Sequence, residues 1–276
     1  PGEAWKPSPI EDPSNAILAT LTANVALPFM ALAATGPLVQ AWFSRRFPTR
    51  SPYPLYAISN VGSLAALLLF PTLIEPSFSL GTTGDFWSLA FVLSGACVVV
   101  CGLIARTGGE REFRDREARP DAGSGTTAPW ALWLLLPACA VTLLMAITNK
   151  LCLDVASVPF LWVLPLGLYL VSFILTFGPQ RSYRRSVYMT LAAFALILQY
   201  AGQDTAGPLA GYLVALGALP AQALFFLLLL FSGCMLAHGE LYRLRPAPDR
   251  LTAFYLAISL GGALGGLFVG LVAPRI

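Results

Sequence analysis

The stretch that decides the fold is residues 148–177, TNKLCLDVASVPFLWVLPLGLYLVSFILTF. It sets the polar residues Asn149, Lys150 and Asp154 directly beside a long apolar run, a pattern that predicts a turn between two membrane-spanning helices. Similar apolar runs recur along nearly the whole chain, with short polar breaks between them. We therefore expect an all-α, polytopic helical membrane protein with about eight transmembrane helices and no separate soluble domain.

The composition agrees with a membrane protein. Of the 276 residues, 57% are hydrophobic and 11% are charged, and the mean hydropathy is +0.70, whereas about a quarter of the residues in soluble proteins are charged. The net charge of +3 is small, which argues against nucleic acid as a partner. Because the chain begins at Pro1 without a methionine or a signal-like region, we expect a fragment or a processed product.

Arginine placement predicts the topology. The predicted spans are 15–43, 54–74, 86–104, 129–147, 155–177, 187–200, 209–237 and 251–272, and the charged, Gly-rich segment 106–128 is expected to be a flexible loop. The loops after spans one, three, five and seven hold 3, 5, 3 and 3 arginines, and the alternate loops hold only Lys150. Since Lys and Arg are enriched in short cytoplasmic loops, we expect these four loops in the cytoplasm of a bacterium, beneath its inner membrane.

The fifth predicted span carries the first candidate binding face. Its less apolar residues are spaced 3, 4, 3 and 4 apart, which places them on one stripe of a helix: Trp162, Pro165, Tyr169, Ser172 and Thr176. Asp154 projects onto the same stripe. The stripe is either the packed side of the helix or a face that lines a ligand path.

The polar residues before this span have two readings. Lys150 and Asp154 are four apart and can pair if the helix continues through them. Ionisable residues deep in a membrane mark a functional site, whereas at headgroup depth they anchor a helix end. Asn149, Lys150, Asp154, Trp162 and Tyr169 are the candidate substrate-binding set.

The end of the seventh predicted span holds a second candidate. His238, the only histidine, and Glu240 flank Gly239. Because histidine titrates near neutral pH, the pair is a candidate cytoplasmic gate. The alternative is that His238 caps the last carbonyls of the helix.

The glycines of the last span and the cysteines are both interpreted as packing residues. In the last span Gly261 and Gly265, and likewise Gly262 and Gly266, are four apart and predict a smooth face for helix packing. The five cysteines form no CxxC pair and have no histidine at ligand spacing, so we read them as buried small residues. We expect no metal, no cofactor and no catalytic set of residues.

Three blocks carry a resemblance to a family: YPLYAISNVGSLAALLLFPTLIEP (residues 53–76), the opening stretch, and HGELYRLRPAPDRLTAFYLAISLGGALGGLF (residues 238–268). They resemble the membrane region of bacterial fused major-facilitator-like/spermidine synthase-like integral membrane proteins. The resemblance implies a partly major-facilitator-like membrane region that precedes an aminopropyltransferase-like domain. We expect this chain to represent the membrane part without the catalytic part.

Three functions remain open from the sequence. The first is a non-catalytic membrane module, either the anchor or scaffold of a spermidine synthase-like protein or a subunit of a larger membrane complex. The second is a transporter or carrier for a small solute of the polyamine type, because a carboxylate and aromatic faces suit an ammonium group. The third is an intramembrane enzyme. The expected partners are the lipid bilayer and either a synthase-like soluble domain or other membrane subunits.

Overall fold

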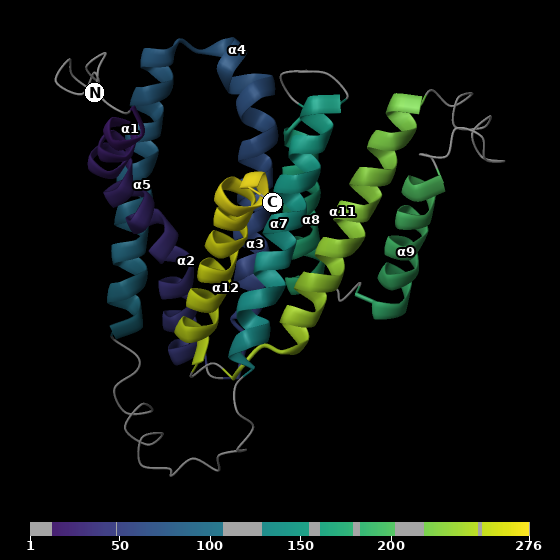
Figure 1. Cartoon of the computed structure of the whole chain (residues 1–276). Coiled ribbons are helices and arrows are strands. Elements are labelled where there is room, and N and C mark those ends of the chain that lie inside the picture. The colour runs from purple at the N-terminus through teal and green to yellow at the C-terminus, as the bar shows by residue number, and fades with distance from the viewer. Residues whose placement is uncertain are drawn as a thin grey trace.

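The computed structural model describes residues 13–47, 49–106, 129–154, 161–178, 183–201, 218–247 and 250–275. Within these ranges the chain is all-α and forms eight helical segments (Figure 1). In chain order the elements are α1 (Pro13–Leu21), η2 (Thr22–Ala26), α2 (Leu27–Arg46), α3 (Tyr53–Leu69), η3 (Phe70–Ile74), α4 (Glu75–Ser77), α5 (Leu80–Arg106), α7 (Trp130–Asp154), α8 (Val163–Phe177), α9 (Arg185–Ala201), α11 (Ala218–Arg243), α12 (Leu251–Leu267), η5 (Phe268–Val272) and η6 (Ala273–Arg275).

Six of the described segments are long and apolar enough to cross a bilayer, which needs roughly 20 residues. They are Ala16–Arg46, Tyr53–Ser77, Leu80–Arg106, Trp130–Leu153, Gln222–Arg243 and Leu251–Arg275. The other two, α8 with 15 residues and α9 with 17, are shorter. The predicted starts of spans five and seven, at residues 155 and 209, lie outside the described residues. The architecture is that of a multi-pass membrane protein by helix length and composition.

Consecutive segments alternate in direction. The C-terminal ends of α2, α5 and α11 and the N-terminal starts of α7, α9 and α12 therefore lie at the same, lower end of the molecule in Figure 1. Arg46 ends α2, Arg106 ends α5, Arg185 begins α9 and Arg243 ends α11. The described arginines of the four basic loops are thus gathered at one end, as the alternation in sequence predicts.

The start of one predicted span and the ends of two others fall short of the observed helices; α5 begins at Leu80 and not at residue 86. Helix α7 continues to Asp154, so the polar residues after Ile147 form its last two turns and are not a turn between helices. Helix α11 continues to Arg243 and does not end at residue 237. The physical reason is that buried apolar residues recur beyond the polar ones: Ile147 and Leu151, four apart, are both buried, and so is Leu241.

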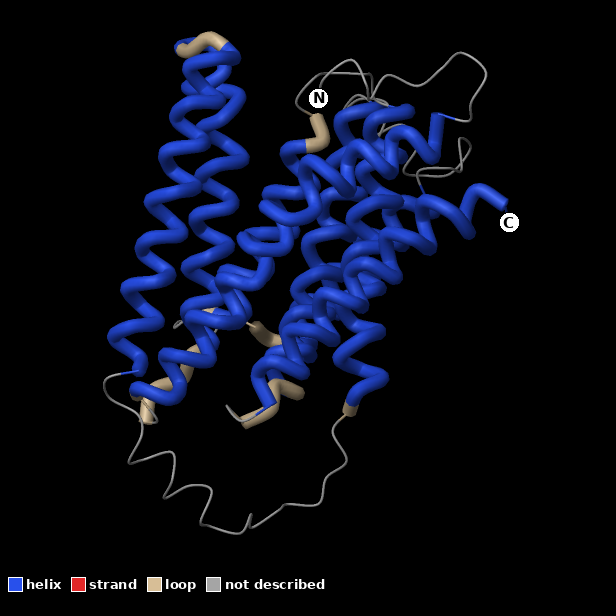
Figure 2. Tube along the Cα trace, turned by 90° about the vertical axis from the view of Figure 1, so that its left-hand side faces the viewer, coloured by secondary structure: helices blue, strands red, loops and turns tan. Residues whose placement is uncertain are grey.

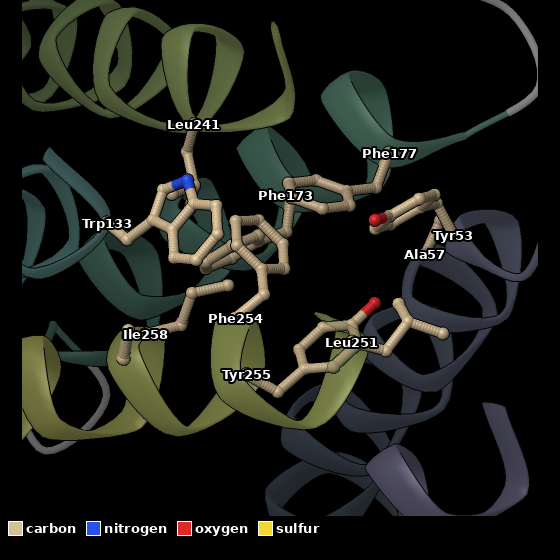
Figure 3. Packing of buried hydrophobic residues seen from close by; sticks show 11 residues of the cluster. Tyr53, Ala57, Trp133, Phe173, Phe177, Leu241, Leu251, Phe254, Tyr255 and Ile258 are labelled. Carbon is tan, nitrogen blue, oxygen red and sulfur yellow. The ribbon is translucent and has the colours of Figure 1, made fainter. Parts of the chain in front are cut away.

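Two clusters of buried side chains hold the bundle together. The first joins α3, α7, α8, α11 and α12 and consists mainly of rings that point toward one another (Figure 3); it contains Tyr53, Ala57, Trp133, Phe173, Phe177, Leu241, Leu251, Phe254, Tyr255, Ala257 and Ile258. The second lies between α7 and α11 and contains Ala140, Ile147, Leu151, Leu230, Cys234 and Ala237. Both clusters depend on α7 and α11, which occupy the centre of the fold.

Helix α12 lies directly against α7. A Cβ atom added at Gly261 would collide with the carbonyl oxygen of Leu134, and one at Gly265 with that of Ala138. The two other glycines of the predicted packing face, Gly262 and Gly266, face side chains of α7 at ordinary van der Waals distance. The absence of side chains at Gly261 and Gly265 is therefore what allows the two backbones to approach.

Helix α5 packs against the rest of the bundle much less closely than α12 does. None of its residues is buried, and its main contact is with α2, where the Trp42 ring lies on Gly102. Figure 2 shows α5 at the edge of the molecule, away from the dense group of helices. Its side chains thus offer a largely apolar surface to whatever surrounds the protein.

Candidate functional site

His238 lies inside the bundle, on α11. Its side chain has no exposed surface. The Phe173 ring stacks on the imidazole with a centroid distance of 3.6 Å, and the Tyr169 ring meets it edge-on at 5.0 Å. Because α11 continues for five residues beyond His238, the prediction that this residue caps the helix is wrong.

The hydrogen bonds of Ser172 define the tautomer of His238. The Ser172 hydroxyl donates to the carbonyl of Tyr169 at 2.6 Å and lies 2.8 Å from His238 Nδ1. A hydroxyl has one hydrogen to give, so Nδ1 carries the ring proton and donates to Ser172 Oγ. Nε2 then holds a lone pair, and it is buried without a hydrogen-bond partner among the described residues. The pair is a polar site beside the aromatic rings of Tyr169 and Phe173.

The predicted stripe of α8 faces this interior along most of its length. Pro165, Ser172 and Thr176 are buried, and Tyr169 is largely covered. Trp162 precedes the helix and is 46% exposed. The stripe therefore packs mainly against other helices, and a binding surface shared by Trp162 and Tyr169 stays a prediction.

The remaining members of the candidate substrate-binding set lie at the end of α7. Asn149 and Lys150 are exposed there, whereas Tyr169 packs against the buried His238 and Phe173. Asp154 is the last residue of α7, and its side chain lies outside the described part of the structure. Pairing of Lys150 with Asp154 therefore stays a prediction.

Glu240 connects α11 to the beginning of α9. The Tyr183 hydroxyl donates to Glu240 Oε1 at 2.7 Å, Arg243 Nη1 donates to the same oxygen at 3.2 Å, and Arg185 Nε lies 3.8 Å from it. A Cβ atom at Gly239 would collide with the Tyr183 ring. Gly239 thus makes room for the ring, and Glu240 holds its hydroxyl.

The position of Tyr183 changes its acidity. Burial, followed by the hydrogen bond to Glu240, raises the pKa of Tyr183 above its ordinary value. The phenol therefore stays protonated and donates to the carboxylate throughout the physiological range. Tyr183 lies 57 residues from Glu240 in sequence, so spacing along the chain does not predict this contact. The glycine between His238 and Glu240 is the local signal for it.

A basic cleft opens at the arginine-bearing end. It has a volume of about 430 Å³ and lies between the chain before α3 and the chain after α11; its lining residues are Thr49, Arg50, Ser51, Pro52, Tyr53, Arg243, Arg245, Pro246 and Ala247. The Tyr53 hydroxyl donates to the Pro246 carbonyl and joins the two walls. In the sequence these arginines predict only the topology, because Arg50 and Arg245 belong to loops far apart along the chain.

Metal binding has little support in the described ranges. No group of three His, Cys, Asp or Glu side chains in them could hold a metal ion. The five cysteines lie within described helices and none forms a disulfide there; only Cys234 is fully buried, while Cys97, Cys101 and Cys139 are exposed. The prediction that the cysteines are buried is therefore wrong for these three, because their helix faces look outward from the bundle.

Comparisons of the chain with known protein families, with curated proteins and with solved structures gave no match. The resemblance to the membrane region of fused major-facilitator-like/spermidine synthase-like proteins therefore stays a prediction.

Proposed function

We propose that this chain is a non-catalytic membrane module: an anchor or scaffold for a spermidine synthase-like domain, or a subunit of a larger membrane complex. In this proposal its partly major-facilitator-like bundle lies in a bacterial inner membrane with the arginine-bearing end in the cytoplasm. A basic cytoplasmic end is the orientation that short Lys- and Arg-containing loops favour. The soluble domain or partner subunit would then meet the arginine-bearing end or the outer helices.

The observation that carries the proposal is the unequal covering of the helices. Helix α5 exposes large apolar side chains along its whole length, among them Trp87 at 56% and Val92 at 66%. Helix α11, by contrast, is surrounded by α7, α8 and α9. A helix held mainly by one neighbour has faces available to further transmembrane helices, as expected of a subunit or a scaffold.

The packed centre supports the same proposal. The rings of Tyr169 and Phe173 contact the His238 ring directly. The Tyr56 ring packs against the rings of Phe173 and Phe177, with a centroid distance of 5.2 Å to each. Such filling stabilises a rigid body, which is what an anchor requires.

Site-specific photo-crosslinking in native membranes tests the proposal. A photoreactive phenylalanine analogue replaces Trp87 or Val92 on α5, and the matched control replaces Leu256 on α12, which is equally exposed at 66%. We expect the α5 positions to crosslink one defined polypeptide that also co-purifies in mild detergent, and the control to crosslink lipid. A chain that purifies alone from native membranes, without a fused domain or a partner, would contradict the proposal.

The buried His238–Ser172 pair favours a second candidate, a carrier for a small solute of the polyamine type, because polar groups inside a membrane bundle often mark a solute path. In this reading Asp154 binds the ammonium group. Uptake of spermidine into proteoliposomes should fall in Asp154→Asn and persist in Asp85→Asn, a control at the exposed start of α5. Equal uptake by both variants, or no uptake at all, would exclude this role.

A further inference from the structure

The basic cleft lies at the ends of two candidate membrane spans. Its walls include Tyr53, the first residue of α3, and Arg243, the last residue of α11. Both helices belong to candidate membrane spans that begin or end at these residues. A ligand in the cleft would therefore lie at the level of the lipid headgroups if the chain spans the membrane.

Arg245 is held in a fixed orientation within the cleft. Its guanidinium carbon lies 4.0 Å from the centre of the Tyr242 ring and 5.5 Å from that of Tyr53. Arg245 Nη1 also donates to the Tyr242 carbonyl at 2.8 Å. A guanidinium carries five donors in one plane, so this bond leaves most of the fork able to bind an anion.

Two further arginines face the same space. Arg243 contacts Glu240 through Nη1 and is 59% exposed, and Arg50 is exposed on the opposite wall beside the Phe47 ring. The described lining thus contains three arginines and no carboxylate. At the N-terminus of the 17-residue helix α3, Pro52 and Pro54 carry no N–H, so the backbone donors on this wall of the cleft are those of Ser51 and Tyr53.

We propose that this cleft binds the phosphate of an anionic phospholipid headgroup. Planar guanidinium groups match phosphate oxygens in pairs, and basic pockets at the cytoplasmic ends of transmembrane helices suit acidic lipids. A soluble phosphate-bearing anion shares this chemistry, but the depth of the cleft favours the lipid. The inference goes beyond the proposed function, because it applies to an anchor and to a carrier alike.

Calorimetric titration of the purified chain in a neutral detergent tests the proposal. The probes are short-chain phosphatidylglycerol, short-chain phosphatidylcholine with the same acyl chains, and inorganic phosphate. We expect saturable binding of phosphatidylglycerol and at least about tenfold weaker binding of phosphatidylcholine, whose headgroup carries no net charge. Inorganic phosphate should compete only at much higher concentration, because it lacks the acyl chains.

Three variants assign the binding to the cleft. Arg245→Gln should weaken phosphatidylglycerol binding about tenfold, as expected for the loss of a charge-assisted contact. Arg50→Gln should weaken it about fivefold, and because Arg50 is exposed this variant tests the site independently of folding. Arg106→Gln is the control: it removes the same charge at the same end of the molecule, but from α5, outside the cleft.

The outcomes separate the possible ligands. Weaker binding in Arg50→Gln and Arg245→Gln, with wild-type binding in Arg106→Gln, supports the proposal. Equal binding of the two lipids, or an equal loss in Arg106→Gln, overturns it, since general surface charge would then explain the affinity. Tight binding of inorganic phosphate without binding of phosphatidylglycerol also overturns it and assigns the cleft to a soluble anion.

Discussion

Helices α5 and α12 have similar apolar compositions but opposite surroundings. Both contain long apolar runs and several glycines, yet α12 has seven buried residues and α5 has none. The difference arises at the glycines: Gly261 and Gly265 lie against the backbone of α7, whereas Gly84 and Gly95 of α5 face open space. Because lipid tails are as apolar as leucine, apolar character alone does not bring two transmembrane helices together, and close backbone approach and ring packing do.

The largest expected effect separates a buried leucine from an exposed one. Leu230 on α11 has no exposed surface, whereas Leu93 on α5 is 56% exposed. We expect Leu230→Ala to lower the free energy of unfolding by about 3 kcal/mol, because it opens a cavity between α11 and α7. Leu93→Ala should change it by less than about 0.5 kcal/mol. Reversible unfolding in mixed detergent micelles measures both values, and equal losses would break the comparison.

A second prediction tests the glycines directly. Gly261→Ala places a methyl group against the Leu134 carbonyl, and the resulting overpacking should cost about 2 kcal/mol. Gly95→Ala puts the same methyl group into open space and should be neutral or slightly stabilising. The same unfolding assay applies. If Gly95→Ala destabilises the fold as much as Gly261→Ala does, α5 must pack against a partner at Gly95.

The polar pair in the interior offers a smaller effect. Ser172→Ala removes the acceptor of the His238 Nδ1 proton and should cost about 1 kcal/mol. The double variant Ser172→Ala/His238→Phe removes both polar partners and should recover most of this loss, because an apolar ring then occupies the aromatic interior. A double-mutant cycle on unfolding free energies checks the recovery. A double variant that is less stable than Ser172→Ala would show that the imidazole has a further partner.

The smallest expected effect concerns the contact between α9 and α11. Tyr183→Phe removes the hydrogen bond to Glu240 and should cost less than about 1 kcal/mol, since the site is near the surface. It should also raise amide hydrogen exchange at the start of α9. Arg184→Gln, an exposed change next to Tyr183, is the control. Unchanged exchange in Tyr183→Phe would argue that helix packing alone holds α9.

The same bond predicts a pH dependence. The pKa of Tyr183 is raised in the folded protein, so its stabilising contribution is complete below the unfolded value of about 10 and is lost as the pH rises toward the folded value. Wild-type stability should therefore fall more steeply above pH 10 than that of Tyr183→Phe. Parallel curves for the two proteins would contradict this assignment.

Much of the fold could be predicted from hydropathy, and the errors have a common cause. The predicted ends of spans four and seven were placed where polar residues begin, before Asn149 and before His238. Backbone hydrogen bonds continue through polar residues, and the buried Leu151 and Leu241 extend the packed faces. A hydropathy pattern therefore locates the apolar part of a helix and not its end.

The candidate sites were predicted less well, because they depend on contacts between distant parts of the chain. Ser172 and His238 are 66 residues apart, and Arg50 meets Arg245 across nearly two hundred residues. Spacing within α8 correctly indicated that Tyr169 and Ser172 share a face, but it did not say that the face would meet His238. It also grouped Trp162 with them, although Trp162 lies at the exposed start of the helix.

Of the about eight transmembrane helices that the sequence predicts, six described segments are long and apolar enough to cross a bilayer. The amino-acid sequence by itself determined the helical, apolar class of the protein and the end at which the described arginines gather. These properties follow from composition and from the order of apolar and charged segments along the chain. Only the tertiary structure decided which helices are covered, which glycines matter and which arginines share a cleft. The physical reason is that lipid and the protein interior are equally apolar. Hydropathy therefore predicts that a residue avoids water, but it does not predict whether lipid or protein surrounds that residue.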